Sequence, residues 1–216
     1  MGYAEPSRRQ ALGELFRGSE SLGIKLSAEQ RNRFQTYIAT LLLWRTRLSL
    51  TAATTDLEIV RRHVLDALHV VSFVRSGFRV ADLGSGAGFP GIPLAIACPQ
   101  STMVLIESKR RRANFLREVV RQAQLANVEV VEQRVEDIGD DFRPCDVAVS
   151  RAVWPLSRYA HFTNRLLRSP GLAIAMKGPT ALVESLPHFS NFCPPQVVRY
   201  HLHDGIERVL ITYQKA

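Results

Sequence analysis

Residues 80–91, VADLGSGAGFPG, are the stretch that decides the fold of this chain. They read as an apolar strand ending in an acid, then a glycine-rich turn, then the start of a helix. A strand over residues 78–83 would lead into a turn where Gly84, Gly86 and Gly88 permit positive φ and let backbone N–H groups approach a ligand. We therefore expect a small polar ligand to bind at this turn.

Two classes of ligand fit this turn. Residues 86–91, GAGFPG, match the dinucleotide-binding spacing GxGxxG, and an acid, Glu107, follows about 20 residues later. Asp82 favours S-adenosylmethionine over NAD, because a carboxylate before the first glycine suits a cationic amino-acid ligand and repels a pyrophosphate. Glu107 would then accept hydrogen bonds from the ribose hydroxyls. A bare glycine turn flanked by two solvated acids is the third possibility.

The composition is typical of a globular chain that can bury a full core, and its charge favours a polyanionic partner. The chain has 216 residues, 46% of them hydrophobic, and a formal charge of +8, which favours nucleic acid as a partner. Its three cysteines are widely spaced, so the sequence predicts neither a disulfide framework nor a metal site. It contains no apolar run near the ~18 residues of a membrane span and no signal-peptide pattern. We expect a cytoplasmic monomer that binds no membrane.

Beyond the turn, short apolar runs alternate with stretches of helical periodicity. The expected strands are residues 103–107, 128–132, 145–150 and 171–176, and the expected helices are residues 91–97, 110–124 and 156–168. This alternation predicts a parallel sheet with helices on both faces. The pair Asp204-Gly205, between β-rich runs, predicts a closing antiparallel hairpin, which a dehydrogenase would not have.

The amino-terminal third predicts helices ahead of the sheet. We expect residues 1–27 to form a flexible arm with about one helical turn, residues 28–77 a helical extension, and residues 78–216 the catalytic domain. In the extension, one helix should begin after Ser27 and another should run from Asp56, as its cap, to about residue 76. Arg62 and Asp66 on the second helix are spaced to form a salt bridge, with His63 packed nearby.

The chain also resembles a known family over residues 34–179. The segments VADLGSGAGFPGIPLAIA, ESKRRRANFLREV, RVED, SRA and KGP, in this order, are similar to those of the RsmG (GidB) family of 16S rRNA guanine-N7 methyltransferases. The most specific match combines residues 88–93, GFPGIP, with Glu107-Ser108 and Ser150-Arg151-Ala152. Residues 62–66, RHVLD, match the family's RHxLDS segment, with alanine in place of the serine.

This resemblance implies an α/β, Rossmann-like fold with a seven-stranded, mostly parallel sheet. It also implies S-adenosylmethionine as the methyl donor and N7 of guanine 527 in 16S rRNA, within the small ribosomal subunit, as the acceptor. Together with the glycine turn, the matched positions give the expected cofactor-binding residues as Asp82, Gly84, Gly86, Gly88, Phe89, Glu107, Val135, Glu136 and Arg151. Arg134, Arg151 and Lys177 match basic positions near the substrate and are the expected catalytic residues.

These three cations suit methyl transfer to N7, because that nitrogen has an in-plane lone pair and no proton to remove. The protein's task is then positioning, and cations at strand ends can bind phosphates and the guanine O6. The basic run Lys109-Arg110-Arg111-Arg112, with Arg117 and Arg121, extends the expected RNA footprint. In a region where the family has W-N-x-x-x-N-L-T, this chain has Trp44-Arg45 and Ser49-Leu50-Thr51.

Two alternative functions remain open at this point. One is a nicotinamide-dependent oxidoreductase, which the GxGxxG spacing permits. The other is a non-catalytic RNA-binding or ribosome-assembly module that keeps the glycine turn without turnover. A cytosine-type methyl transfer through a thiolate is not expected, because Cys145 stands at the amino-terminal start of its strand and would lie at the opposite edge of the sheet.

Overall fold

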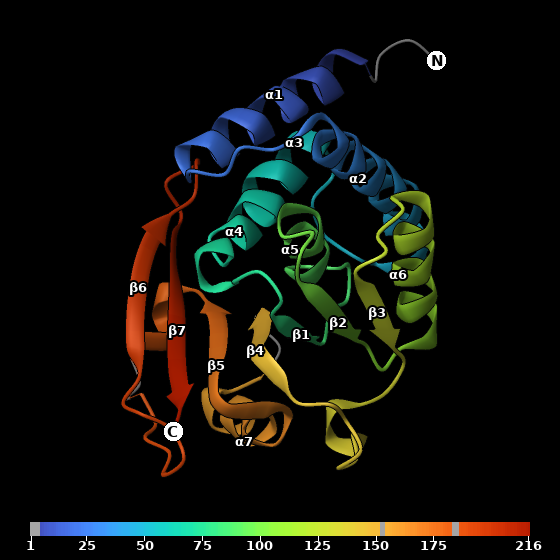
Figure 1. Cartoon of the computed structure of the whole chain (residues 1–216). Helices are drawn as coiled ribbons and strands as arrows, with labels where there is room; N and C mark the ends of the chain where they lie inside the picture. Colours follow the sequence, from blue (N-terminus) through green and yellow to red (C-terminus); the bar gives the residue numbers. More distant parts are fainter. Residues whose placement is uncertain (1–4, 152–153, 183–185) are drawn as a thin grey trace.

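A seven-stranded mixed sheet in the order β3-β2-β1-β4-β5-β7-β6 forms the centre of the computed structural model, which describes residues 5–151, 154–182 and 186–216 (Figure 1). The strands are β1 (Arg79–Leu83), β2 (Thr102–Ile106), β3 (Val128–Val131), β4 (Cys145–Arg151), β5 (Leu167–Lys177), β6 (Gln196–His201) and β7 (Glu207–Lys215). The first five pair in parallel, while β7 runs antiparallel to both β5 and β6. The predicted fold class is confirmed.

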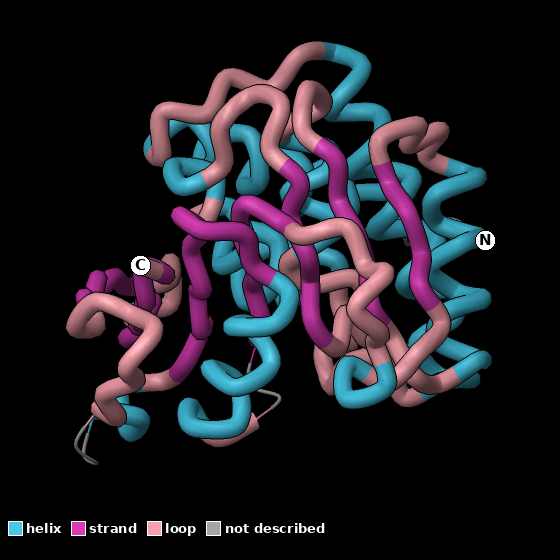
Figure 2. The backbone as a smooth tube through the Cα atoms, turned by 60° about the horizontal axis from the view of Figure 1, so that its bottom comes forward, coloured by secondary structure: helices cyan, strands magenta, loops and turns pink. Residues whose placement is uncertain are grey.

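Helices cover both faces of this sheet, so that the strands lie between two helical layers (Figure 2). The helices are α1 (Glu5–Ser21), α2 (Ala28–Leu48), α3 (Asp56–Ile59), α4 (Leu65–Leu68), α5 (Gly91–Ala97), α6 (Arg110–Gln122) and α7 (Leu156–Leu166). Short turns are η1 (Val60–Val64), η2 (Val71–Phe73), η3 (Val135–Asp137) and η4 (Pro179–Leu182). The strand order reverses between β1 and β4, and open α/β sheets bind ligands at the carboxyl ends of strands at such a point.

Alternation along the strands divides the core between the two layers. Val80 and Leu105 are buried with side chains of α2, α5 and α6, whereas their neighbours Ala81 and Ile106 are buried with side chains of α7. Strands that are apolar on both faces are what a sheet covered on both sides requires. The strands expected from the sequence are therefore all present, with ends that differ by a few residues.

The start of α2 agrees with its sequence signal. The Ser27 side chain accepts a hydrogen bond from the Gln30 backbone N–H (3.2 Å), and the Gln30 side chain accepts one from the Ser27 N–H (2.8 Å). The same Gln30 amide donates to Ile96 O (2.9 Å) at the end of α5. The Gln30 side chain thus both completes the cap of α2 and connects α2 to α5.

The amino-terminal arm differs from its expectation of about one helical turn. Residues 5–21 form one 17-residue helix, α1, whose Ala11 and Leu15 are completely or almost completely buried. Buried Glu14 accepts from Arg61 Nε (3.0 Å), which joins α1 to the turn η1. The sequence shows an apolar patch in this arm, Leu12, Leu15 and Phe16, but not the tertiary contacts that stabilise the helix.

The second helix of the extension also differs from its expectation. Its N-cap is Thr55, whose side chain accepts a hydrogen bond from the Glu58 backbone N–H (3.2 Å). Asp56 is instead the first helical residue, and its carboxylate accepts a hydrogen bond from Arg8 Nε (3.1 Å). The helix passes through a π-turn at η1 and ends at Leu68 instead of running to residue 76. Such π-turns occur often at functional sites.

Candidate active site at the carboxyl edge of the sheet

The glycine turn after β1 has the backbone that the sequence predicts. Gly84, Gly86 and Gly88 have φ of 73°, 55° and 92°, the left-handed region that glycine adopts without strain. At Gly91, where α5 begins, an added Cβ would lie 2.2 Å from a Leu105 methyl group, so only glycine allows this close approach. The turn is a tightly built backbone loop at the start of a helix.

Asp82 holds this loop in place through a hydrogen bond from its backbone. Its side chain is buried, and Oδ2 accepts a hydrogen bond from the Gly91 N–H (2.9 Å). Its other oxygen, Oδ1, is also buried and has no hydrogen-bond partner. Burial raises the pKa of the Asp82 carboxyl to about 7, opposed by the hydrogen bond from the Gly91 N–H. A buried acceptor without a partner is what a cationic ligand group would satisfy.

Glu107 stands directly after β2 and shapes the same loop from the side. Its Oε2 accepts from the Gly86 N–H (2.9 Å) and its Oε1 from the Lys109 N–H (2.8 Å). The carboxylate is buried, and each oxygen keeps a further lone pair that a hydroxyl could use. Asp82 and Glu107 therefore both organise the loop through hydrogen bonds from its backbone.

Two more of the predicted cofactor residues, Val135 and Glu136, lie after β3. Val135 is buried in the turn η3, and the Glu136 carboxylate accepts from Arg158 Nη2 (2.7 Å) on α7. Arg134 immediately precedes η3 and is exposed. An apolar side chain next to an acid at this edge can flank a flat heterocycle such as adenine.

These residues fit S-adenosylmethionine. The unpartnered Asp82 oxygen suits a ligand ammonium, Glu107 suits ribose hydroxyls, and Val135 suits an adenine ring, along three adjacent strands of one edge. A pyrophosphate would instead face two buried carboxylates. The geometry therefore favours the sulfonium cofactor over NAD.

A cavity of about 400 Å³ lies beside the loop, under the ends of β4 and β5. It is lined by Arg62, His63, Asp66, Arg151, Met176, Lys177, Gly178 and Arg208. Two of the expected catalytic cations, Arg151 and Lys177, thus share one cavity. Arg134 does not line it, because β2 and β1 separate the end of β3 from the end of β4. The Lys177 amine donates to Trp154 O, and burial lowers its pKa.

The Arg151 guanidinium is held by the π-turn of the extension. Its Nη2 lies 2.8 Å from His63 Nδ1 and its Nη1 lies 3.3 Å from Asp66 Oδ2. The guanidinium carbon is 5.1 Å from the ring centroid of Phe89, a residue of the glycine loop. The helix salt bridge between Arg62 and Asp66, which the sequence suggested, is not formed: Arg62 pairs with Asp204 (3.2 Å).

His63 is neutral in this arrangement. Burial, aided by the Arg151 charge, lowers its pKa to about 3. Because Arg151 can only donate, Nδ1 must accept, so the ring proton is on Nε2 and is donated to Thr51 Oγ1 (2.8 Å). His63 therefore orients Arg151 and offers no free nitrogen as a base.

Two aromatic residues of the site were missed by sequence reasoning. Tyr37 on α2 donates to Ala87 O (2.8 Å) and packs edge-on against Phe89, so the extension supports the glycine loop. Tyr200 on β6 donates to Asp66 Oδ1 (2.6 Å). Tyr37 lies three residues after Phe34, a spacing that places both on one face of a helix, so the sequence could have indicated Tyr37, whereas no local signal marks Tyr200.

The region where the chain departs from the family pattern borders this site. Arg45 Nη1 donates to Ala53 O (2.8 Å), and Ser49 ends α2 in the left-handed conformation, with φ of 48°. Thr51, which matches the family, is the residue that holds His63. Ala152, the third residue of the SRA motif, lies outside the described residues.

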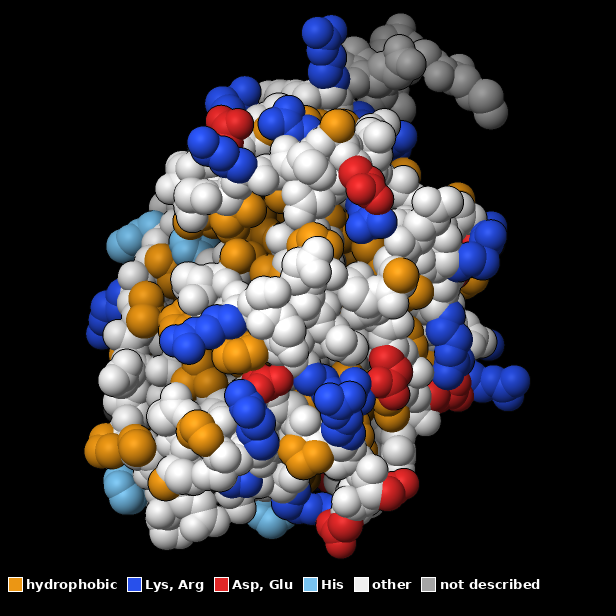
Figure 3. Space-filling view, viewed as in Figure 1, with side chains coloured by type: hydrophobic (Ala, Val, Ile, Leu, Met, Phe, Trp, Pro, Cys, Tyr) orange, Lys and Arg blue, Asp and Glu red, His pale blue; other side chains and the backbone are white. Residues whose placement is uncertain are grey.

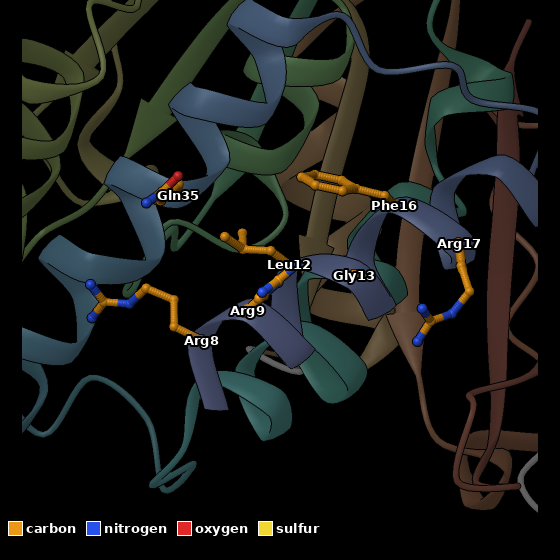
Figure 4. A pocket seen from close by; sticks show the side chains of 7 residues that line it. All are labelled: Arg8, Arg9, Leu12, Gly13, Phe16, Arg17 and Gln35. Atoms are coloured by element: carbon orange, nitrogen blue, oxygen red, sulfur yellow. The ribbon is translucent and has the colours of Figure 1, made fainter. Parts of the chain in front are cut away.

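Other surface features surround the site. A larger hollow of about 710 Å³ lies between α1 and α2, and it contains no acid that could hold the cofactor (Figure 4). Lys and Arg side chains are spread over the visible face (Figure 3). Within residues 5–151, 154–182 and 186–216, no helix is long and apolar enough to cross a membrane, and no three or more His, Cys, Asp or Glu side chains are grouped to hold a metal ion.

Solved structures share the fold. A protein from Agrobacterium tumefaciens, described as a predicted O-methyltransferase, superimposes with a TM-score of 0.60 at 23% identity, covering 70% of this chain and 81% of that chain. TYW2 of M. jannaschii, solved in complex with AdoMet, gives a TM-score of 0.57 at 15% identity, covering 70% and 74%. The fold is that of S-adenosylmethionine-dependent methyltransferases.

Sequence relatives are more specific. A protein from Pseudomonas aeruginosa named ribosomal RNA small subunit methyltransferase G is 38% identical over 81% of this chain and 82% of its own length. One of the same name from Caldanaerobacter subterraneus is 36% identical over 79% and 74%. The family model GidB, described as rRNA small subunit methyltransferase G, matches residues 30–207. The chain therefore belongs to the rRNA small subunit methyltransferase G (GidB) family.

Proposed function

We propose that this enzyme transfers a methyl group from S-adenosylmethionine to N7 of a guanine in small-subunit ribosomal RNA, at position 527 of the 16S molecule. The observation that carries the proposal is a cavity of about 400 Å³ lined by Arg62, Arg151, Lys177 and Arg208. Arg151 lies at once in this cavity and over Phe89 of the glycine loop. An anionic nucleotide would thus meet the methyl donor at the switch point of the sheet.

The cofactor half of the site is formed by β1, β2 and the turn after β3. Asp82 would receive the cofactor ammonium on its free oxygen, Glu107 the ribose hydroxyls, and Val135 the adenine ring. When bound, S-adenosylmethionine supplies an electrophilic methyl group on a sulfonium centre. The protein's own contribution is to hold this group in line with the acceptor.

The substrate half needs cations and no general base. Guanine N7 already carries a free lone pair and needs no deprotonation. His63 could not act as a base in any case, because both of its ring nitrogens are hydrogen-bonded. Arg151 and Lys177 can donate hydrogen bonds to the guanine O6 or to its phosphate. Arg134, at the exposed end of β3, is better placed to meet flanking phosphates than the reacting base.

The first turn of α6 extends the proposed RNA surface. Lys109, Arg110 and Arg111 are exposed and begin two residues after Glu107, so their charges border the cofactor half of the site. Arg117 and Arg121, further along α6, are paired with Glu132 and Glu118 (both 2.7 Å). The beginning of the helix is therefore the part we assign to phosphate binding.

The two alternative functions make different predictions. Membership of a methyltransferase family rules against a nicotinamide-dependent oxidoreductase, and the buried carboxylates Asp82 and Glu107 oppose a pyrophosphate. A module that binds RNA without turnover would retain ribosome association and show no methyl transfer.

The test is to incubate small subunits from a strain lacking this methylation with the purified chain and methyl-labelled cofactor. Mapping should find one labelled guanine, and the label should be released by the mild base and aniline cleavage typical of N7-methylguanine. Asp82→Asn serves as the control with an intact fold and a weakened cofactor site. Label at an exocyclic amine, or none, would refute the proposal.

A further inference from the structure

The carboxyl-terminal hairpin contacts the active site through one side chain. Tyr200, on edge strand β6, donates its hydroxyl to Asp66 Oδ1 at 2.6 Å. The Asp66 side chain is only 3% exposed, and its other oxygen binds Arg151 at 3.3 Å. A continuous chain of hydrogen bonds therefore runs from the hairpin, through the extension, to the end of β4.

This chain of contacts determines where the guanidinium lies. Arg151 is an end-of-strand residue whose long side chain could adopt many rotamers, yet Asp66 and His63 hold two of its nitrogens. His63 is itself held by Thr51, and Asp66 by Tyr200. Each anchor of Arg151 thus has a second residue behind it.

Tyr200 is well suited to this role. Its ring stacks on His69 with centroids 3.9 Å apart, which fixes the direction of the hydroxyl, and the pKa of the phenol is raised by burial, so it remains a donor. The nearby pair Arg62–Asp204 (3.2 Å) joins the turn of the same hairpin to the same helix. The hairpin is therefore attached at two points, to Arg62 in the π-turn η1 and to Asp66 in α4.

We propose that Tyr200 is a positioning residue for methyl transfer: through Asp66 it holds the Arg151 guanidinium over Phe89, where cofactor and nucleotide meet. This inference rests on the proposed function only in assigning Arg151 to the methyl-transfer site. It gives the antiparallel hairpin, remote from the glycine loop in sequence, an indirect part in the reaction, through Asp66 and Arg151.

The test uses Tyr200→Phe in the full chain, which keeps the ring and removes the hydroxyl. This variant loses the hydrogen bond from Tyr200 to the Asp66 carboxylate. Because that bond serves to position Arg151 for methyl transfer, its loss should lower kcat about tenfold and leave KM for both substrates within about twofold of the parent value. Tyr213→Phe is the matched control, because its buried hydroxyl has no partner. It should leave kcat unchanged.

Coupling distinguishes positioning from general packing. If Tyr200 acts through Arg151, then Tyr200→Phe should change kcat by less than about twofold in an Arg151→Lys background. A full tenfold loss on top of Arg151→Lys would overturn the proposal, as would unchanged kcat in Tyr200→Phe alone.

A readout without activity separates this inference from the proposed function. In nitrogen-15 spectra, the Arg151 Nε–H signal, identified by its loss in Arg151→Lys, should be sharp in the parent chain and in Tyr213→Phe. In Tyr200→Phe it should broaden or move toward the position of exposed arginines. An unmoved signal would overturn the positioning role even if the chain methylates RNA, and a moved signal would sustain it even if the substrate assignment failed.

Discussion

Replacing Asp82 by asparagine tests the cofactor site at its most buried group. Asparagine keeps the size of the side chain and an oxygen to accept from the Gly91 N–H, while the charge is removed and the other oxygen is replaced by an NH2 group that cannot accept from an ammonium. The charged oxygen without a partner is the one we assign to the cofactor ammonium. A charge-assisted hydrogen bond of about 1.5–3 kcal/mol corresponds to roughly 10- to 150-fold weaker binding of S-adenosylhomocysteine at pH 8.

The pH dependence makes this prediction specific. Because the pKa of Asp82 is raised to about 7, the carboxyl is mostly ionised at pH 8 and mostly protonated at pH 6. Affinity of the parent chain should fall about tenfold per pH unit below 7, whereas Asp82→Asn should show no such slope. Titration calorimetry with S-adenosylhomocysteine between pH 6 and 8 measures both. Equal affinities at pH 8, or a flat profile for the parent chain, would refute the assignment of Asp82.

The same shift predicts the opposite effect on stability. A carboxyl whose pKa is raised on folding, from 3.8 to about 7, stabilises the fold most below pH 3.8, and this contribution is lost as the pH rises through 7. Asp82→Asn should therefore melt at a higher temperature than the parent chain at pH 8, and the difference should shrink toward pH 4. Scanning calorimetry without cofactor measures it, and a variant less stable at pH 8 would contradict this account of Asp82.

Three further predictions concern other parts of the site. Gly86→Asp places a carboxylate beside Glu107 and should abolish detectable S-adenosylhomocysteine binding. Gly77→Asp is the control: Gly77 also has a positive φ (81°, against 55° at Gly86) but lies before β1, so this variant should bind like the parent chain. Ser49→Asn should stabilise the chain by about 0.5–1 kcal/mol in thermal unfolding, because asparagine tolerates the left-handed conformation better than serine. Reversing Arg110 and Arg111 to glutamate should weaken RNA binding and reduce the slope of log K against log salt by about 2, measured by filter binding.

Controls keep these results interpretable. If Gly86→Asp and Gly77→Asp both lose cofactor binding, the loss reflects general instability and not the loop. For the charge reversal, Arg75 and Arg143 are exposed at the opposite edge of the sheet and should tolerate reversal with an unchanged salt slope. An unchanged slope for the α6 variant would remove that helix from the RNA surface.

The sheet and the glycine loop could be predicted because their signals are local. Residues 80–91 contain the strand, the acid and the glycines in one run, and Asp204-Gly205 marks its hairpin turn directly. Ser27 and Gln30 likewise identify the start of α2 within four residues. Such elements can be predicted from the sequence because the residues that stabilise them lie within the same short segment.

The contacts that position Arg151 could not be predicted in this way. Asp66 has a local helical partner in Arg62, but it is held instead by Tyr200, 134 residues away along the chain. The length of α1 was underestimated for the same reason, since buried Leu15 and Glu14 stabilise it only through distant elements. Such long-range contacts follow from the assembled fold and leave no periodic trace in the sequence.

The most direct test of the central claim is to map the methyl group that the purified chain adds to undermethylated small ribosomal subunits. With labelled S-adenosylmethionine, we predict label on N7 of a single guanine of 16S rRNA, at position 527, and strongly reduced label with Asp82→Asn at pH 8. Label on another atom or spread over many bases would contradict the account, and so would unlabelled RNA from a chain that binds S-adenosylhomocysteine.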